Sequence, residues 1–182
     1  MIKCVLKNIN KDIKAEYSGD LVDVVYGGEY KDGDFFEVSS DFEFISASFD
    51  GSQKSSVIYA PEKNFTYVLP FGPERAAYDY KSWEKGEHHI VIKEACEEEV
   101  YKERNIALNS IDKADNKNLF PHAAANFVTR GEAVFQPRNA IDGVCENKAH
   151  GGYPYHSWAG GAREDLVYTL DFGCEVEIKE II

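Results

Sequence analysis

The chain has 182 residues, of which 43% are hydrophobic and 13% aromatic, and this is enough apolar material for a folded core. Its formal net charge of −12 excludes nucleic acid and anionic membrane surfaces as partners, because a phosphate-rich surface repels an excess of carboxylates. No apolar run approaches the roughly 20 residues that a membrane-spanning helix needs.

The first residues carry no secretory signal pattern. Only Cys4-Val5-Leu6 stands between two lysines, which is too short for the apolar region of a signal peptide. The four cysteines are scattered and form no C-x-x-C pair, so we expect reduced thiols: Cys4, Cys96, Cys145 and Cys174. A cytoplasmic location is the expectation, and action outside the cell stays open.

The N-terminal half reads as a series of short strands. Its segments are rich in Val, Ile, Phe and Tyr and are separated by turn residues such as Asp50-Gly51: 22–26, 35–38, 42–49, 56–59, 65–69 and 88–92. Turn signals every 8–12 residues without a helical period indicate an antiparallel sandwich or barrel. We therefore predict an N-terminal β-sandwich domain over residues 1–100.

The composition changes after this half. Residues 94–104 are acidic and free of Gly and Pro, which favours a short helix or a solvated linker, with a domain boundary near residue 100. Residues 105–135 are polar and predict mostly loop. Alternating apolar residues return at 166–170, which predicts a strand, and residues 176–182 begin another.

Several short motifs follow one another in the second half. They are Asn105–Asn109, Arg138–Gly143, Ser157-Trp158 and Leu170–Gly173, the last followed by alternating apolar residues. In this order, over residues 105–182, they resemble the galactose-binding-like β-sandwich superfamily. That superfamily includes coagulation-factor type C (discoidin-like) domains and related carbohydrate-binding modules.

The resemblance implies a second jelly-roll-like domain over 101–182. A complete domain of this type would continue past residue 182, so its missing strands belong either to a longer protein or to another chain, as in a homo-oligomer. A half sandwich alone buries little surface and leaves open strand edges. The predicted fold is all-β, with two antiparallel β-sandwich domains of which the second is incomplete.

Two ligand sites follow from the resemblance and from the residue types. The superfamily often holds a structural Ca²⁺ near the Asp-Gly turn, and Asp142 matches that position, with Asn147 or Glu146 adding oxygens. The alternative is that Asp142 only closes a turn. A saccharide site needs aromatic platforms and polar donors, and the loop before residue 164 supplies Tyr153, Tyr155, His156, Trp158 and Arg163. For Trp158 a role as a core residue is the favoured interpretation, whereas Tyr153, Tyr155 and His156 stay open between a ligand site and a solvated loop.

The sequence supports a catalytic function less than it supports ligand binding. His122, His150 and His156 with Asp142 or Cys145 are the residue types of a metal site or nucleophilic pair, but neither an H-E-x-x-H nor a G-x-S-x-G pattern is present. We therefore expect a non-catalytic carbohydrate-binding protein whose partner is a saccharide. The alternatives are a structural or protein-interaction module without a sugar site, and an accessory part of a glycoside hydrolase.

Overall fold

The computed structural model describes residues 1–79, 82–83, 86–116, 118–145 and 157–181, and strands dominate its regular structure. The strands of the N-terminal half are β1 (Ile2–Lys7), β2 (Ile13–Gly19), β3 (Leu21–Tyr26), β4 (Phe35–Ser40), β5 (Phe44–Ser48), β6 (Ser56–Tyr59), β7 (Asn64–Val68) and β8 (His88–Glu94). The remaining elements, with η for a 3-10 helix, are η1 (Gly72–Ala77), α1 (Glu97–Tyr101), β9 (His122–Ala125), η2 (Thr129–Gly131), η3 (Ala133–Phe135), η4 (Pro137–Ala140) and β10 (Tyr168–Asp171). The predicted all-β fold is confirmed.

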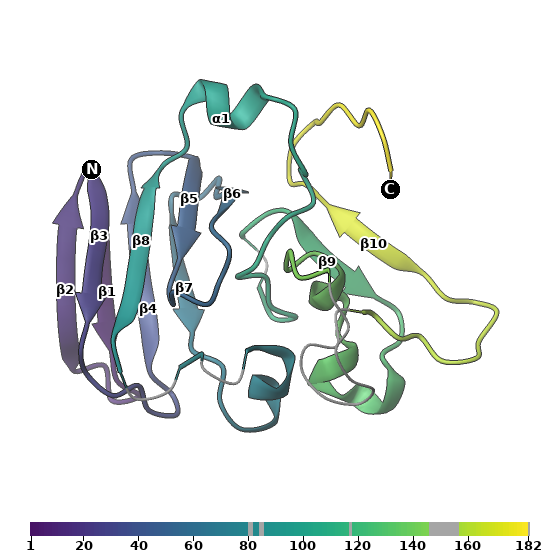
Figure 1. Cartoon of the computed structure of the whole chain (residues 1–182), viewed down its shortest axis with the longest axis horizontal. Helices are drawn as coiled ribbons and strands as arrows, with labels where there is room; N and C mark the ends of the chain where they lie inside the picture. The colour runs from purple at the N-terminus through teal and green to yellow at the C-terminus, as the bar shows by residue number, and fades with distance from the viewer. Residues whose placement is uncertain (80–81, 84–85, 117, 146–156, 182) are drawn as a thin grey trace.

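The N-terminal strands form two four-stranded sheets. Their orders are β2-β1-β4-β7 and β3-β8-β5-β6, and neighbouring strands are antiparallel throughout. The chain changes sheet between β2 and β3, β3 and β4, β4 and β5, β6 and β7, and β7 and β8, so consecutive strands build both layers together. Figure 1 shows the two sheets overlapping in the purple-to-teal half of the molecule.

One hydrophobic core is shared by these two sheets. On β8, Ile90 and Ile92 are completely buried, as the period of two requires for one face of a strand. The ring of Phe49 stacks on Phe36 and on Tyr67, with centroids 4.8 and 4.7 Å apart. Burial of each such side chain contributes about 1.5–3 kcal/mol, so this core supplies the main stabilisation of the fold.

A short acidic helix, α1, connects this half with the rest of the chain. It has no buried residue, and Figure 1 shows it above the sheets at the point where the chain crosses to the second half. The prediction of a short helix or solvated linker over 94–104 is confirmed. No helix in the described ranges has the length and apolar character needed to cross a membrane.

Residues 105–121 pack against the N-terminal sheets. Ile111 and Leu119 are buried in the same core as the strand residues. The backbone of Phe120 exchanges two hydrogen bonds of 2.9 Å with Tyr59 at the end of β6. The segment after α1 is therefore attached to the first half by apolar burial and by main-chain pairing.

The strands β9 and β10 form a separate two-stranded antiparallel sheet. His122 lies opposite Asp171, and Ala125 lies opposite Tyr168. A small second cluster of apolar side chains accompanies the 3-10 helices between these strands: Val134 and Phe135, with Val128 and Ala159 packed against them. Among the described residues of 101–182, β9 and β10 are the strands that form a sheet. The second β-sandwich and its jelly-roll character stay a prediction.

The strand predicted from residue 176 is not formed. Residues 172–181 have no strand structure, and Val176 and Ile178 are exposed. Alternating apolar residues favour an extended backbone, but a strand also requires a hydrogen-bonded neighbour. No described residue pairs with this segment in a ladder, and the prediction is wrong for that reason.

Candidate functional site

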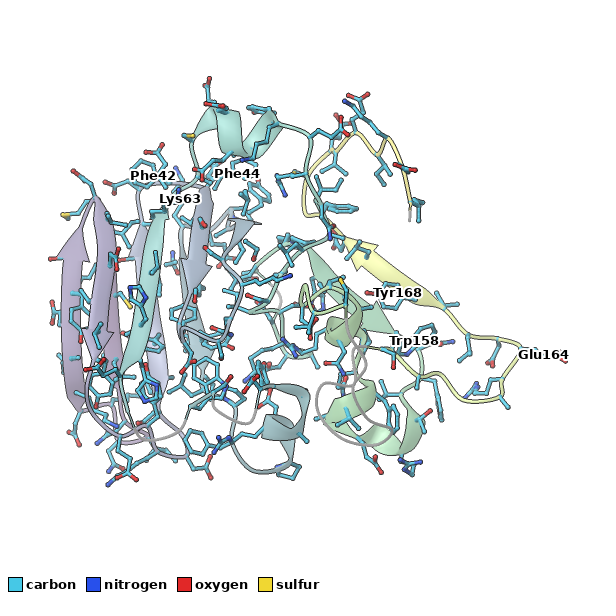
Figure 2. All side chains as sticks on the ribbon, viewed as in Figure 1. Phe42, Phe44, Lys63, Trp158, Glu164 and Tyr168 are labelled. Carbon is cyan, nitrogen blue, oxygen red and sulfur yellow. The ribbon has the colours of Figure 1, made fainter. Side chains whose placement is uncertain are left out.

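Trp158 is held in place by a hydrogen bond and a ring contact. Its indole Nε1 donates to the main-chain carbonyl of Phe127 at 2.8 Å. Its ring lies against that of Tyr168 on β10, with centroids 5.4 Å apart, and Figure 2 shows the two labelled side chains next to each other. Because Trp158 remains partly exposed, it is both an anchor of the chain and an accessible aromatic surface.

Arg163 lies beside the same segment. Its guanidinium binds the Asp165 carboxylate through two hydrogen bonds of 2.8 and 2.5 Å. The guanidinium carbon also lies 5.0 Å from the ring centroid of Phe127. Phe127 therefore connects two of the predicted ligand residues, since its carbonyl holds Trp158 and its ring supports Arg163.

The other residues predicted for the two sites lie outside the described residues. They are Tyr153, Tyr155 and His156 for the saccharide and Asn147 for calcium. Their place relative to Trp158 and Arg163 stays a prediction.

Asp142 closes the turn in which it stands. Its Oδ1 accepts the backbone N–H of Val144 at 2.9 Å, and the next residue, Gly143, has a φ of +83°. The amine of Lys54 donates to the Gly143 carbonyl, which ties this turn to the N-terminal half. In the part of the chain that the structure describes, no group of three or more His, Cys, Asp or Glu is arranged to hold a metal. Calcium at Asp142 stays a prediction.

A pocket of about 120 Å³ lies between β9 and η4. Small apolar side chains form much of its wall, and its polar members are a histidine, a glutamine and an arginine: Ala114, His122, Ala123, Ala124, Ala125, Val128, Gln136, Pro137 and Arg138. The hydroxyl of Tyr168 donates to the carbonyl of Pro137 at 3.3 Å. The Trp158–Tyr168 pair is thus attached directly to a residue of the pocket wall.

His122 enters this pocket from the first position of β9. Its Nδ1 lies 2.7 Å from Oδ1 of Asp112, and the other oxygen of Asp112 accepts the backbone N–H of Ala123 at 2.9 Å. Asp112 is completely buried, while His122 keeps 18% of its side-chain surface exposed. The hydrogen bond to Asp112 raises the pKa of His122, because it stabilises the imidazolium.

Arg138 lies on the buried side of the pocket. Its guanidinium donates to the main-chain carbonyls of Asp112 at 2.7 Å, of Ala77 at 3.2 Å and of Ser110 at 2.9 Å. The guanidinium carbon stands 4.3 Å from the ring centroid of Tyr78. Arg138 therefore joins η4, the segment before β9 and the end of η1, and it fixes the back of the pocket.

Sequence reasoning named His122 as a histidine of interest but not its partner. Asp112 stands ten residues earlier in a segment without a strand pattern, and Gln136 and Arg138 carry no ligand motif of their own. Protein-family models, curated proteins and solved structures were all compared with this chain, and none matches it. The resemblance of residues 105–182 to the galactose-binding-like superfamily therefore stays a prediction.

Proposed function

We propose that this chain is a non-catalytic carbohydrate-binding protein of the galactose-binding-like superfamily. The observation that carries the proposal is the pocket between β9 and η4 with the Trp158–Tyr168 pair attached to its wall. Apolar walls suit the C–H face of a sugar ring, and a few polar groups among them suit its hydroxyls. The side-chain amide of Gln136 has no hydrogen-bond partner among the described residues, which leaves it available to a ligand.

A glycan-array screen of the whole chain tests the proposal. The expected result is binding to a defined set of glycans and a change in tryptophan fluorescence when those glycans are added. Gln136→Leu and Tyr153→Ala should each weaken binding about tenfold or more, since a lost polar contact of about 1.4 kcal/mol is tenfold in affinity. Tyr101→Ala is the control, because Tyr101 is 80% exposed on α1 and does not line the pocket.

Two results would contradict the proposal. An array without any signal would remove carbohydrate as the ligand. Binding that survives both Gln136→Leu and Tyr153→Ala would place the ligand elsewhere on the molecule.

A protein-interaction role is the second candidate, favoured by a separate observation. The final segments expose large apolar side chains: Val167, Val176, Ile178 and Ile181. A contact with another chain or with a further part of the same protein would bury these side chains. If this role is right, light scattering will show a mass that rises with protein concentration, and Ile178→Lys will abolish the rise.

A further inference from the structure

The described part of the chain contains three histidine–aspartate pairs, and they differ in what surrounds them. His88 bonds Asp50 inside the core, where its second ring nitrogen, Nε2, is buried without a partner. His89 bonds Asp23 on the surface, where both side chains are 51% exposed. His88 and His89 are consecutive on β8, and successive side chains of a strand point to opposite faces. Only the pair formed by His122 combines a fully buried carboxylate with an imidazole in a pocket.

The contacts of Asp112 determine which nitrogen of His122 carries the proton. One oxygen of Asp112 accepts the backbone N–H of Ala123, and the other lies 2.7 Å from Nδ1 of the ring. Burial raises the pKa of Asp112, and the hydrogen bonds with His122 and Ala123 oppose that rise. When the carboxyl group is ionised, both of its oxygens act only as acceptors. The proton of a neutral His122 must then be on Nδ1. This leaves Nε2 with a free lone pair, in a single tautomer fixed by the fold.

The free nitrogen of His122 is open to a ligand. Nε2 has no hydrogen-bond partner among the described residues, and it does not belong to the polar atoms that are buried without one. Gln136 is the other pocket residue with an unpaired polar group. The pocket therefore offers one obligate acceptor and one amide that both donates and accepts.

The charges around the pocket select against an anionic ligand. Asp171 lies opposite His122 on β10, and its charge favours the imidazolium, as does that of Asp112. Arg138 is the one cationic side chain of the described wall, and each of its guanidinium nitrogens already donates to a main-chain carbonyl. While His122 is neutral, a carboxylate or sulfate would therefore find nearby carboxylates and no cation that is free to bind it.

We propose that His122 is the ligand-binding residue of this pocket, that its Nε2 accepts a hydrogen bond from a hydroxyl of a neutral saccharide, and that acid weakens the binding. The inference rests on the proposed function and adds to it the class of ligand and its regulation. Asp112 acts as the positioning residue, because it touches the imidazole and not the ligand.

Protonation explains the regulation. An imidazolium has no lone pair on Nε2 and can only donate, so the hydrogen bond from the hydroxyl is lost. The ligand must also displace water from a cation, which costs free energy. A neutral hydrogen bond contributes about 0.5–1.5 kcal/mol, and the upper part of this range corresponds to about tenfold in affinity.

Calorimetric titrations at pH 8.5 and pH 5.0 test the inference. The probes are the methyl glycosides of galactose, glucose and mannose, with galacturonate as the acidic counterpart. The wild-type chain should bind its preferred methyl glycoside about tenfold more weakly at pH 5.0, and galacturonate should bind no tighter than that glycoside at either pH. His122→Gln should give the same affinity at both pH values. His89→Gln is the matched control, which should keep the tenfold change.

Nitrogen-15 NMR of the histidine rings gives a readout that does not depend on a ligand. At pH 8.5 the ring of His122 should be the Nδ1–H tautomer, and addition of the methyl glycoside should shift its Nε2 resonance. Binding with equal affinity at both pH values, tighter binding of galacturonate at pH 5.0, or an Nε2–H tautomer would each overturn the inference and leave carbohydrate binding standing. Absence of binding to any saccharide at either pH would overturn both.

Discussion

Replacing Arg138 with methionine should destabilise the whole chain. The guanidinium is the hydrogen-bond donor for the carbonyls of Asp112, Ala77 and Ser110, and methionine fills similar space but donates nothing. Each buried acceptor left unpaired costs about 1–3 kcal/mol, partly offset because a buried cation no longer needs to be desolvated. The expected loss is about 3–5 kcal/mol of unfolding free energy, which corresponds to about 10 °C in the melting temperature of a domain of this size.

Urea denaturation followed by tryptophan fluorescence, with calorimetry for the melting temperature, measures this loss. Wild type should unfold in one transition, because Arg138 bonds both halves of the chain. Arg163→Met is the matched control, since its ion pair with Asp165 is on the surface and screened by solvent; its midpoint should not move. A midpoint for Arg138→Met equal to that of the control would refute the reasoning that the three carbonyls depend on this side chain.

Three further outcomes are expected. Gly143→Ala should lower the denaturation midpoint more than Gly131→Ala. Both glycines have positive φ, but only at Gly143 would the added Cβ also meet the side chain of Leu108, at 2.5 Å. Equal effects of the two substitutions would assign the cost to the positive φ alone. Iodoacetamide should spare Cys4 in the native chain, since burial raises its pKa to about 12, and mass spectrometry should find label on Cys96, Cys145 and Cys174. The pKa of His122 is higher in the folded than in the unfolded chain, where it is about 6.5, so protonation of His122 stabilises the fold at low pH. This stabilisation is lost as the pH rises through the folded-state pKa. The difference in unfolding free energy between wild type and His122→Gln should therefore shrink between pH 6 and pH 9.

The strands of the N-terminal sheets are largely predictable from sequence. Six predicted segments overlap β3 to β8 within one or two residues, because each combines β-branched or aromatic residues with a turn. β1 was not predicted, since buried Val5 between two buried neighbours breaks its alternation. β2 is an edge strand that contains Lys14 and Glu16 among its apolar residues, so it lacks an apolar run. β9 contains three alanines, which carry little strand signal.

The candidate site is less predictable because its contacts are not local. The role of Trp158 as an anchor follows from residue type, and the structure supplies the partner carbonyl on Phe127. The pairing of Asp112 with His122 depends on the path of the chain between the two residues, and their separation of ten positions matches no regular helix or strand spacing that would predict it. From sequence, a charged residue such as Arg138 is expected to lie on the surface. It is buried in this fold because backbone carbonyls from separate segments accept hydrogen bonds from its guanidinium.

The burial of Leu119 in the first core has a consequence for biosynthesis. Translation completes β8 at Glu94, yet the core of the two sheets is closed only when Ile111 and Leu119 arrive, about 25 residues later. At a translation rate of about 5–20 residues per second, the eight strands exist for about 1–5 s with an apolar patch that is not yet covered. During that interval the nascent chain is a substrate for chaperones that bind exposed apolar surface, and codons that slow translation between α1 and β9 would lengthen it.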